Sequence, residues 1–364
     1  MSHTSISIVM AAYNAAPFIS DTLERIAGQM TAAHELIVVD DGSRDDTAGQ
    51  VRAIQARHPA LRIVLHQQAN TGIAGARNAG LALAGGQYLA FIDSDDRLRP
   101  GALAALDAVI AREQPDVIST AFRFWHPDAP HKDRDVQLSY PAGRRIEGQD
   151  AILVPFFNDR HTYLWNNVCK REVYARLPQP PFPTGRLFED LSVVPLLLAH
   201  CRSMVYLPFV LLDYRQHPAS ITKAVSARWC EDVVTALASA RAPLAQTGIS
   251  AAVQQRFDAT VCDFYVSTVK CSYQLPGGEG KAVRARLRAI FLSSLFTPVE
   301  QLRASLSAPG ASKADRRNAR QLGQILRGAW LFHLRQTASR QFKLWRRARN
   351  KRKPGSGHTV AQDA

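Results

Sequence analysis

The first 120 residues alternate short apolar segments with helix-length segments, and this alternation limits the possible folds more than any other feature of the sequence. We expect strands at residues 5–11, 36–39, 61–65, 88–92 and 117–121, and helices at 17–30, 47–57, 74–84 and 101–112. Apolar strands separated by helices of about 10–15 residues are typical of a parallel sheet that is covered on both faces. The sequence therefore predicts an α/β fold with a Rossmann-like, mostly parallel sheet.

Acidic segments follow two of the expected strands. Right-handed crossovers bring the carboxyl ends of parallel strands to one edge of the sheet, where such sheets bind their ligands. After the strand at 36–39 comes Asp40-Asp41-Gly42-Ser43. Its carboxylates could accept hydrogen bonds from a base or a ribose. The segment could equally be a capped turn, because Asp, Gly and Ser are favoured turn residues.

The segment after the strand at 88–92 is more acidic. Asp93, Asp95 and Asp96 are three acids within four residues, with Ser94 between the first two. A divalent cation would offset their repulsion, and carboxylate oxygens are the ligands that Mg²⁺ and Mn²⁺ prefer. Because Mg²⁺ usually binds through one or two carboxylates and substrate phosphates, a nucleoside diphosphate is implied. A helix N-cap would explain one of the acids but not all three.

A glycine-spaced segment, NTGIAGARN at residues 70–78, lies between the two acidic segments and leads into an expected helix. It is not the GxGxxG fingerprint of dinucleotide-binding proteins. Arg77 within it could reach a phosphate or pair with an aspartate of the acidic cluster. A surface arginine on a helix is the alternative.

The positive charge of the chain is concentrated near its C-terminus. The net charge is +14, and residues 313–353 carry +13 of it, so the rest of the chain is close to neutral. A neutral body argues against nucleic-acid binding. From Leu326 to Trp345 apolar residues recur at near-helical spacing opposite basic ones, which predicts an amphipathic helix on an anionic membrane surface. A helix packed on the body is the alternative.

Other sequence features restrict the class of protein. The five cysteines include no CxxC pair, so we expect neither a disulfide framework nor a cysteine zinc site, and a reducing compartment fits. The longest apolar stretch, residues 191–214, is interrupted by His200, Arg202 and two prolines, which is too polar for a membrane span. Residues 226–306 look helical, and 307–312 resemble a linker.

Seven segments are informative as a set. They are SIVMAAYN (7–14), LIVVDDGSRDDT (36–47), NTGIAGARNAG (70–80), GGQYLAFIDSDD (85–96), WNNVCKR (165–171), FED (188–190) and YRQHPASIT (214–222). In this order they resemble the family 2 glycosyltransferases of the GT-A fold, over about residues 5–225. The resemblance implies a catalytic domain at 1–225, with a nucleotide-sugar half at about 1–100 and an acceptor half at about 101–225. A helical accessory region (226–312) and the basic tail (313–364) lie outside the resemblance.

The resemblance also implies roles for single residues. The donor pocket would be lined by Ala12, Tyr13, Asn14, Asp41, Arg77, Asp93 and Ser94, with Asp41 on the base. Asp93 and Asp95 match the family's DxD motif, and Asp95 would hold Mn²⁺ or Mg²⁺, with Asp93 and His217 as further ligands. Asp190 would take the proton of the acceptor hydroxyl, assisted by Glu189, and Trp165 would flank the acceptor sugar.

These later residues have structural interpretations as well. Glu189 and Asp190 could be the acids of a helix first turn, His217 a solvated loop residue, and Trp165 a core aromatic. As a base, Asp190 needs a raised pKa and therefore a less solvated position than Asp95. The region 122–145 matches no acceptor site of the family, so the acceptor is not specified.

The expected activity is metal-dependent, inverting transfer of a sugar from a nucleoside diphosphate sugar, with UDP-sugar the commonest donor in the family. The acceptor would be a saccharide or a lipid-linked saccharide in surface polysaccharide assembly. We expect the protein in the cytoplasm, peripheral on the inner face of the membrane. A non-catalytic membrane- or partner-binding protein on the same scaffold is one alternative. A nucleotidyltransferase is another, but it would need a glycine-rich phosphate loop where this chain has AAYNAAP (11–17).

Overall fold

The alternating segments at the start of the chain form the expected strands and helices. The computed structural model describes residues 5–217, 225–328, 332, 334 and 336–338. The strands of this first part are β1 (Ile6–Ala12), β2 (His34–Asp40), β3 (Arg62–Gln67) and β4 (Tyr88–Phe91). Its helices are α1 (Ile19–Ala27), α2 (Thr47–Arg57), α3 (Gly72–Leu83) and α4 (Ala102–Glu113). β1 pairs in parallel with β2 and β4, and β2 with β3, so their carboxyl ends share one edge.

The second part of the chain completes the sheet. It adds the strands β5 (Arg97–Leu98), β6 (Val117–Trp125), β7 (Arg134–Val136), β8 (Arg145–Glu147), β9 (Asn167–Lys170) and β10 (Ser203–Arg215). It also contains the 3₁₀ helix η1 (Pro130–Lys132) and the helices α5 (Gln149–Asp159), α6 (Arg171–Tyr174) and α7 (Glu189–Ala199). In the described part of the chain the order is β3-β2-β1-β4-β9-β6-β10-β5, with β7 on β6 and β8 on β10. The predicted α/β sheet is confirmed.

One central strand departs from the parallel pattern. β9 lies between β4 and β6 and is antiparallel to both. Its four residues, NVCK, include only two apolar ones and therefore form no apolar run, so this strand could not be predicted from its pattern. β9 joins the two halves of the sheet into a continuous surface.

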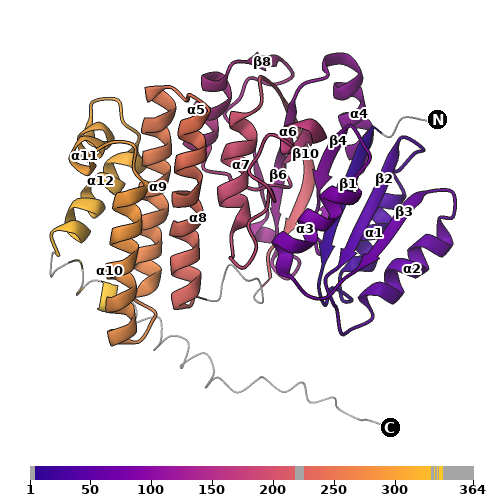
Figure 1. Cartoon of the computed structure of the whole chain (residues 1–364), viewed down its shortest axis with the longest axis horizontal. Helices are drawn as coiled ribbons and strands as arrows, with labels where there is room; N and C mark the ends of the chain where they lie inside the picture. Colours follow the sequence, from indigo (N-terminus) through magenta and orange to yellow (C-terminus); the bar gives the residue numbers. More distant parts are fainter. Residues whose placement is uncertain (1–4, 218–224, 329–331, 333, 335, 339–364) are drawn as a thin grey trace, which may run out of the picture.

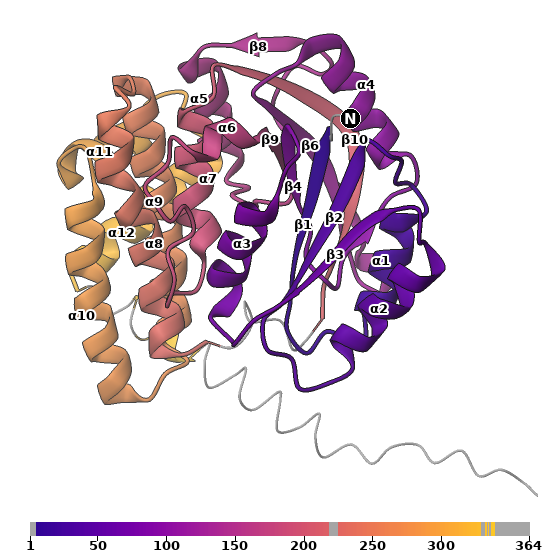
Figure 2. The same ribbon diagram turned by 45° about the vertical axis from the view of Figure 1, so that its right-hand side comes forward.

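The two faces of the sheet are covered by different helices (Figure 2). Side chains alternate along β1, so that Ile8 and Met10 pack with α1, α2 and α4, whereas Val9 packs with α3 on the other face. Gly80 on α3 lies against this second face, where an added Cβ would come within 2.3 Å of Val9 Cγ1. Because Gly80 has no side chain, α3, which carries Arg77, can pack closely against the sheet at this position.

The C-terminal region is helical, as expected from the sequence. It contains α8 (Ala227–Gln246), α9 (Ala251–Ser272), α10 (Gly277–Ser294), α11 (Val299–Ser307) and α12 (Lys313–Leu326). These helices stand beside the sheet in Figure 1, and α8 packs against α7 while α9 packs against α5. Their buried side chains belong to the same hydrophobic cluster as the α3 face of the sheet. The accessory helices therefore hold α5 and α7 from behind.

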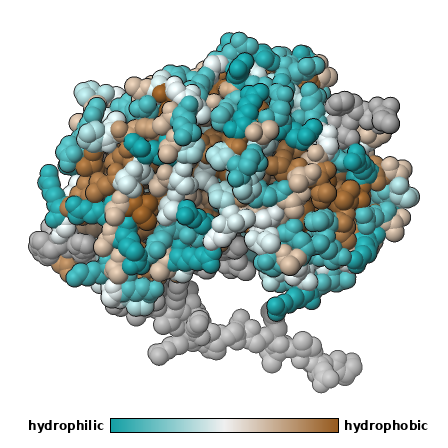
Figure 3. Space-filling view, in the orientation of Figure 1, coloured by the Kyte–Doolittle hydropathy of each residue, from teal (hydrophilic) through white to brown (hydrophobic). Residues whose placement is uncertain are grey.

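The start of the basic tail packs on the body. α12 buries Ala319 and Leu322, while Arg316, Arg317 and Arg320 stay exposed. Most of the predicted amphipathic helix from Leu326 to Trp345 lies outside the described residues. Among the described helices none is long and apolar enough to cross a bilayer. On the face drawn in Figure 3, hydrophobic areas form small patches between hydrophilic side chains.

Candidate active site

The loops after β1, β2 and β4 meet at the carboxyl edge of the sheet. The Asp41 N–H donates to the carbonyl of Ala12 at 2.9 Å, which ties the ends of β1 and β2 together. Asn14, in the left-handed region (φ 48°), accepts from the Arg44 N–H through its Oδ1 at 2.8 Å. Tyr13 is 50% exposed beside it. This edge therefore offers backbone at Ala12, an ordered amide at Asn14 and an open aromatic ring.

The Asp41 carboxylate is buried and fully engaged. It accepts hydrogen bonds from the N–H groups of Thr71 (2.9 Å) and Gly72 (2.8 Å), and from Gln68 Nε2 (2.8 Å). These donors surround the N-terminus of α3, where a carboxylate is favoured. Asp41 thus makes the capping contacts that the sequence left as an alternative, and its predicted contact with a base stays a prediction.

The acidic loop after β4 is held by buried contacts. Thr22 donates its hydroxyl to the carbonyls of Ser94 (3.1 Å) and Asp96 (2.8 Å). Asp96 is completely buried; one carboxyl oxygen accepts from the Arg215 N–H at 2.8 Å, and the other has no partner among the described residues. Burial and the neighbouring Asp95 and Asp93 raise the pKa of Asp96 well above its ordinary value. Asp96 therefore anchors the loop rather than facing the cleft.

Asp95 and Asp93 point to different partners. Asp95 Oδ2 lies 3.2 Å from His217 Nε2, and burial together with the charge of Asp93 raises the pKa of Asp95. Asp93 forms an ion pair with Arg77 at 2.8 Å. In the described part of the chain no three His, Cys, Asp or Glu side chains are gathered into a ready metal site. Asp95 and His217 fit a cation that has few protein ligands and takes the rest from phosphate and water.

Arg77 links the acidic loop to a second acidic pair. Its guanidinium is 5% exposed and pairs with Asp93 on one side and with Glu189, also 5% exposed, on the other. Glu189 and Asp190 form the first turn of α7, directly after Phe188 in the left-handed region (φ 63°). The predicted pairing of Arg77 with an aspartate of the acidic cluster is confirmed, whereas its second partner Glu189 and its burial were not predicted.

Asp190 has the environment that a general base requires. Its side chain keeps some surface open to solvent although protein atoms surround it densely. Burial and the charge of Glu189 raise its pKa to about 7, against the opposing effect of Arg77. The pKa of Asp190 thus lies close to neutral pH, where a carboxyl group can accept a proton and release it again.

Comparison with known proteins agrees with this arrangement of residues. The family described as "Glycosyl transferase family 2" matches residues 7–174, which contain the carboxyl ends of β1, β2 and β4 and the acidic loop. Over these 168 of its 364 residues the chain is similar to glycosyl transferase family 2. It is therefore a glycosyltransferase, as its sequence motifs predicted.

Relatives of this glycosyltransferase differ in how much of the chain they share. Glycosyltransferase GlyG of Streptococcus pneumoniae is 23% identical and covers 79% of the chain, which spans 96% of GlyG. The uncharacterized glycosyltransferase YibD of Escherichia coli is 33% identical over 61% of the chain, which spans 64% of YibD. For YibD the likeness thus extends over slightly less than two thirds of the relative's length.

Solved structures share the fold of this glycosyltransferase. Residues 1–349 of Staphylococcus aureus TarS, crystallised with UDP-GlcNAc, superpose with a TM-score of 0.68 at 17% identity, covering 88% of this chain and 90% of that one. The mannosyltransferase PcManGT of Pyrobaculum calidifontis, with GDP-Man and Mn²⁺, gives a TM-score of 0.50 at 17% identity, covering 94% and 88%. The GT-A fold followed by C-terminal helices is thereby confirmed.

The aromatic residues near Asp190 are arranged differently from the expectation for Trp165. The glycosyltransferase buries Trp165 to 4% exposure, and the Tyr163 ring stacks on it with centroids 4.7 Å apart. Tyr163 lies close enough to Asp190 for that charge, with burial as the larger cause, to raise the pKa of the phenol to about 12. Trp165 is thus mainly a core residue, and its packing supports the ring of Tyr163.

Sequence reasoning gave no role to Arg215, although the YRQH segment contains it. Its Nε donates to the Asp95 carbonyl at 2.6 Å, and its guanidinium lies over the rings of Trp125 (4.2 Å) and Phe18 (4.8 Å). Cation–π contacts of this kind hold a guanidinium without neutralising it. The one signal in the sequence for such a role was the position of this arginine, directly before Gln216-His217. Its contact with the acidic loop depends on the sheet topology, which no local pattern contains.

Proposed function

We propose that this glycosyltransferase transfers a sugar from a nucleoside diphosphate sugar, in particular a UDP-sugar, to a hydroxyl of a saccharide or lipid-linked acceptor, with inversion at the anomeric carbon. The observation that carries the proposal is the Arg77 bridge, which sets the donor aspartates beside a carboxyl group with a pKa of about 7. By analogy with the polysaccharide-forming relatives, we infer a role in surface polysaccharide assembly, as in the "Succinoglycan biosynthesis protein ExoO" of Rhizobium meliloti.

The donor would bind along the carboxyl edge of the sheet. Tyr13 can stack on the base, and the backbone near Ala12 and Asn14 can border the ribose. Asp95 and His217 would hold Mn²⁺ or Mg²⁺, and the bound ion would offset the negative charge of the leaving diphosphate. The structure of PcManGT in complex with GDP-Man and Mn²⁺, which has a similar fold, supports this assignment.

Asp190 would act on the acceptor. Its carboxylate takes the proton of the attacking hydroxyl as the new bond forms between that oxygen and the anomeric carbon. The bond from this carbon to the diphosphate oxygen breaks, and the electron pair leaves with the nucleoside diphosphate. Direct displacement by the hydroxyl that Asp190 activates, with no covalent intermediate, would invert the configuration at this carbon. Glu189 is occupied by Arg77, so its contribution would be to raise the pKa of Asp190 rather than to move a proton.

A thermal-stability assay with a panel of nucleotides tests the donor assignment. At a hundredfold excess over Kd, a ligand that binds only the folded state stabilises it by about 2.7 kcal/mol. We expect this stabilisation with one nucleoside diphosphate, only when Mn²⁺ is present, and not in Asp95→Asn. Asp128→Asn removes an exposed acid elsewhere and should bind as the parent protein does. Equal stabilisation by the nucleotide with and without Mn²⁺, or unchanged stabilisation in Asp95→Asn, would refute the metal site.

A transfer assay separates an enzyme from a non-catalytic scaffold. With the donor identified by the stability assay, Asp190→Asn should bind it with unchanged affinity and release its sugar far more slowly to acceptor or water. Equal turnover by Asp190→Asn and the parent protein would place the base elsewhere. Donor binding without any turnover over a broad acceptor panel would favour the scaffold alternative.

We also infer that the basic segment 313–353 docks on an anionic membrane surface. Exposed arginines on α12 support this, because each basic residue near such a surface contributes about 1 kcal/mol. Truncation after Gly328 keeps α12, which is packed on the body, but removes nine of the basic residues, and should weaken binding of the protein to anionic vesicles in a flotation assay. Vesicle binding that is unchanged by the truncation would assign the docking to another surface.

A further inference from the structure

A large cavity lies at the opposite end of α7 and β10 from the acidic residues. Its volume is about 610 Å³, and it is lined by the turn between β8 and α5, the turn between α7 and β10, Arg176 and Thr247. β10 runs from this cavity at Ser203 to the acidic loop at Arg215. At roughly 3.3 Å per residue, the thirteen residues of β10 separate the two places by about 40 Å. The cavity is therefore distinct from the proposed donor and acceptor sites.

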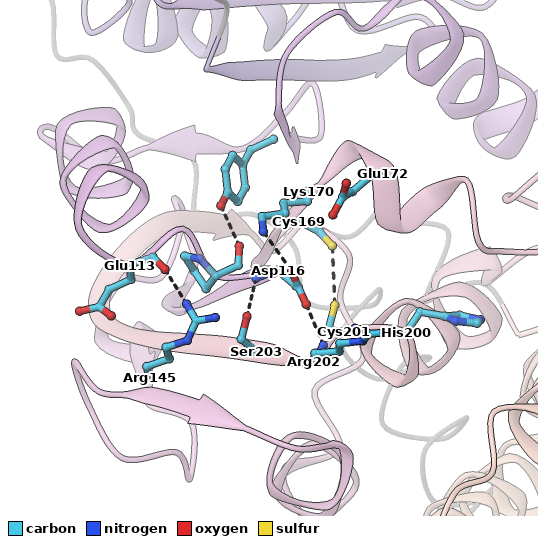
Figure 4. A network of polar contacts seen from close by, with 12 residues as sticks. Glu113, Asp116, Arg145, Cys169, Lys170, Glu172, His200, Cys201, Arg202 and Ser203 are labelled. Atoms are coloured by element: carbon cyan, nitrogen blue, oxygen red, sulfur yellow. Dashed lines mark hydrogen bonds and ion pairs between the residues drawn. The ribbon is translucent and has the colours of Figure 1, made fainter.

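Positive side chains converge on this cavity. Arg145, Arg176 and Arg202 line it, and Glu147 is the one acidic residue in the lining. Arg202 is exposed, and among the described residues its guanidinium has no ion-pair partner. Its backbone, in contrast, is fixed: the N–H donates to Asp116 at 2.8 Å, as drawn in Figure 4, and the carbonyl accepts from the Gly148 N–H at 3.1 Å. The structure thus holds an unneutralised cation at a set position.

The other two arginines are oriented by contacts that leave part of their charge available. Arg145 Nε donates to Glu147 at 2.9 Å, and Nη1 donates to the carbonyl of Glu113 (Figure 4). Arg176 Nη1 donates to the carbonyl of His200 at 3.2 Å, and its Nη2 lies 3.6 Å from the exposed Glu172. The three guanidinium groups thus have two carboxylate partners, Glu147 and Glu172, which leaves an excess of one positive charge.

The start of α5 brings backbone N–H groups to the cavity. The helix has eleven residues and begins beside Gly148 at the cavity wall; no side chain caps its first N–H groups, and its first turn carries the exposed acid Asp150. Uncapped N–H groups at a helix N-terminus attract anions through their partial positive charge. His200, also in the lining, has its pKa lowered by burial and by Arg176, as expected where positive charge is concentrated.

We propose that this cavity, here called the cationic pocket, binds a phosphate-bearing ligand. A phosphate dianion offers several acceptor oxygens to arginine forks and helix N–H groups at once, whereas a carboxylate offers only two. The phosphate could belong to a soluble anion or to a phospholipid headgroup, and both present the same group to Arg202. The proposal is independent of the proposed transfer reaction, because it involves neither Asp190 nor the acidic loop.

Calorimetric titration of the full chain with inorganic phosphate tests the cationic pocket. EDTA in the buffer suppresses metal-dependent binding at the donor site. We expect one saturable binding event whose affinity falls about tenfold or more in Arg202→Glu, because a charge-assisted hydrogen bond is replaced by repulsion. Arg52→Glu makes the same charge change on the exposed surface of α2, far from the pocket, and should bind phosphate as the parent protein does. Equal thermal stability of both variants shows that the fold is retained.

Vesicle binding then separates the two sources of phosphate. If a lipid headgroup is the ligand, Arg202→Glu should weaken binding to phosphatidylcholine vesicles that contain phosphatidic acid, by more than Arg52→Glu does. If a soluble anion is the ligand, the two variants should bind the vesicles equally and differ only in the phosphate titration. The proposal is overturned if phosphate shows no saturable binding, or if Arg202→Glu and Arg52→Glu have equal effects in both assays.

Discussion

Removal of the Arg77 guanidinium should destabilise the protein far more than removal of a surface arginine. Arg77 and Glu189 are each only 5% exposed, and Asp93 is 28% exposed. Breaking a buried ion pair from one side typically costs about 3–5 kcal/mol, because a charge is left buried without a partner. We expect Arg77→Gln to lower the free energy of unfolding by about 3 kcal/mol at pH 7, the lower end of that range, because Asp93 can still reach water.

Glu189, the second partner of Arg77, gives a more specific test of the buried ion pair. Glu189→Gln should cost less than Arg77→Gln, since Arg77 retains Asp93. Adding Glu189→Gln to Arg77→Gln removes the stranded carboxylate and should recover much of the lost stability. A double-mutant cycle should then yield a coupling energy of about 2 kcal/mol, within the range for directly interacting residues.

Urea unfolding followed by circular dichroism measures these differences. Arg25→Gln is the matched control: its pair with Asp21 is 38% and 41% exposed and should contribute less than about 1 kcal/mol. If Arg77→Gln costs no more than Arg25→Gln, or if the double variant is as unstable as the sum of the single ones, the bridge is not a buried coupled network and the reasoning is wrong.

Three further predictions follow from the same geometry. The kcat/KM of sugar transfer should rise with pH through a midpoint near 7 and level off above it, because only the ionised Asp190 can accept a proton; a flat pH–rate profile between pH 5.5 and 8.5 would contradict this. Asp41→Ala should lower the melting temperature even without nucleotide, because the Thr71 and Gly72 N–H groups lose their acceptor, and calorimetry that shows an unchanged apo melt would count against the capping role. Gly86→Ala should cost about 1–3 kcal/mol in urea unfolding, since its Cβ would lie 2.7 Å from the backbone nitrogen of Ser7, whereas Gly277→Ala, which meets nothing within 4 Å, should be nearly neutral.

The elements up to about residue 121 could be predicted because their information is local. Apart from the two-residue strand β5, each strand and helix there has its own apolar pattern, and the acidic segments follow directly after strands. The parallel topology then places those segments at one edge without further information. The place of Asp93 and Asp95 at this edge could therefore be predicted, and so could an ion pair between Arg77 and an aspartate of the acidic cluster, although the sequence did not show which aspartate takes part.

The remaining site features depend on contacts between distant segments. Glu189 meets Arg77 across 112 positions, and Asp96 meets Arg215 across 119, so no sequence window contains both partners. The burial of Trp165 likewise depends on Tyr163, in the segment before β9, and on Phe122, in β6. A resemblance to a family gave these residues plausible roles, but only the folded arrangement distinguishes a buried bridge from a ligand or a core ring from a sugar platform.

The place of β9 has a consequence for how the chain is made. During synthesis β4 and β6 emerge first, and neither can complete its central pairing until residues 167–170 have left the ribosome. Until then each presents an unpaired apolar edge, the kind of surface on which nascent chains associate wrongly. Fragments that end soon after residue 125 should therefore aggregate rather than fold on their own. Any attempt to shorten or exchange the part of the chain after β6 must keep β9, because this four-residue strand closes the middle of the sheet.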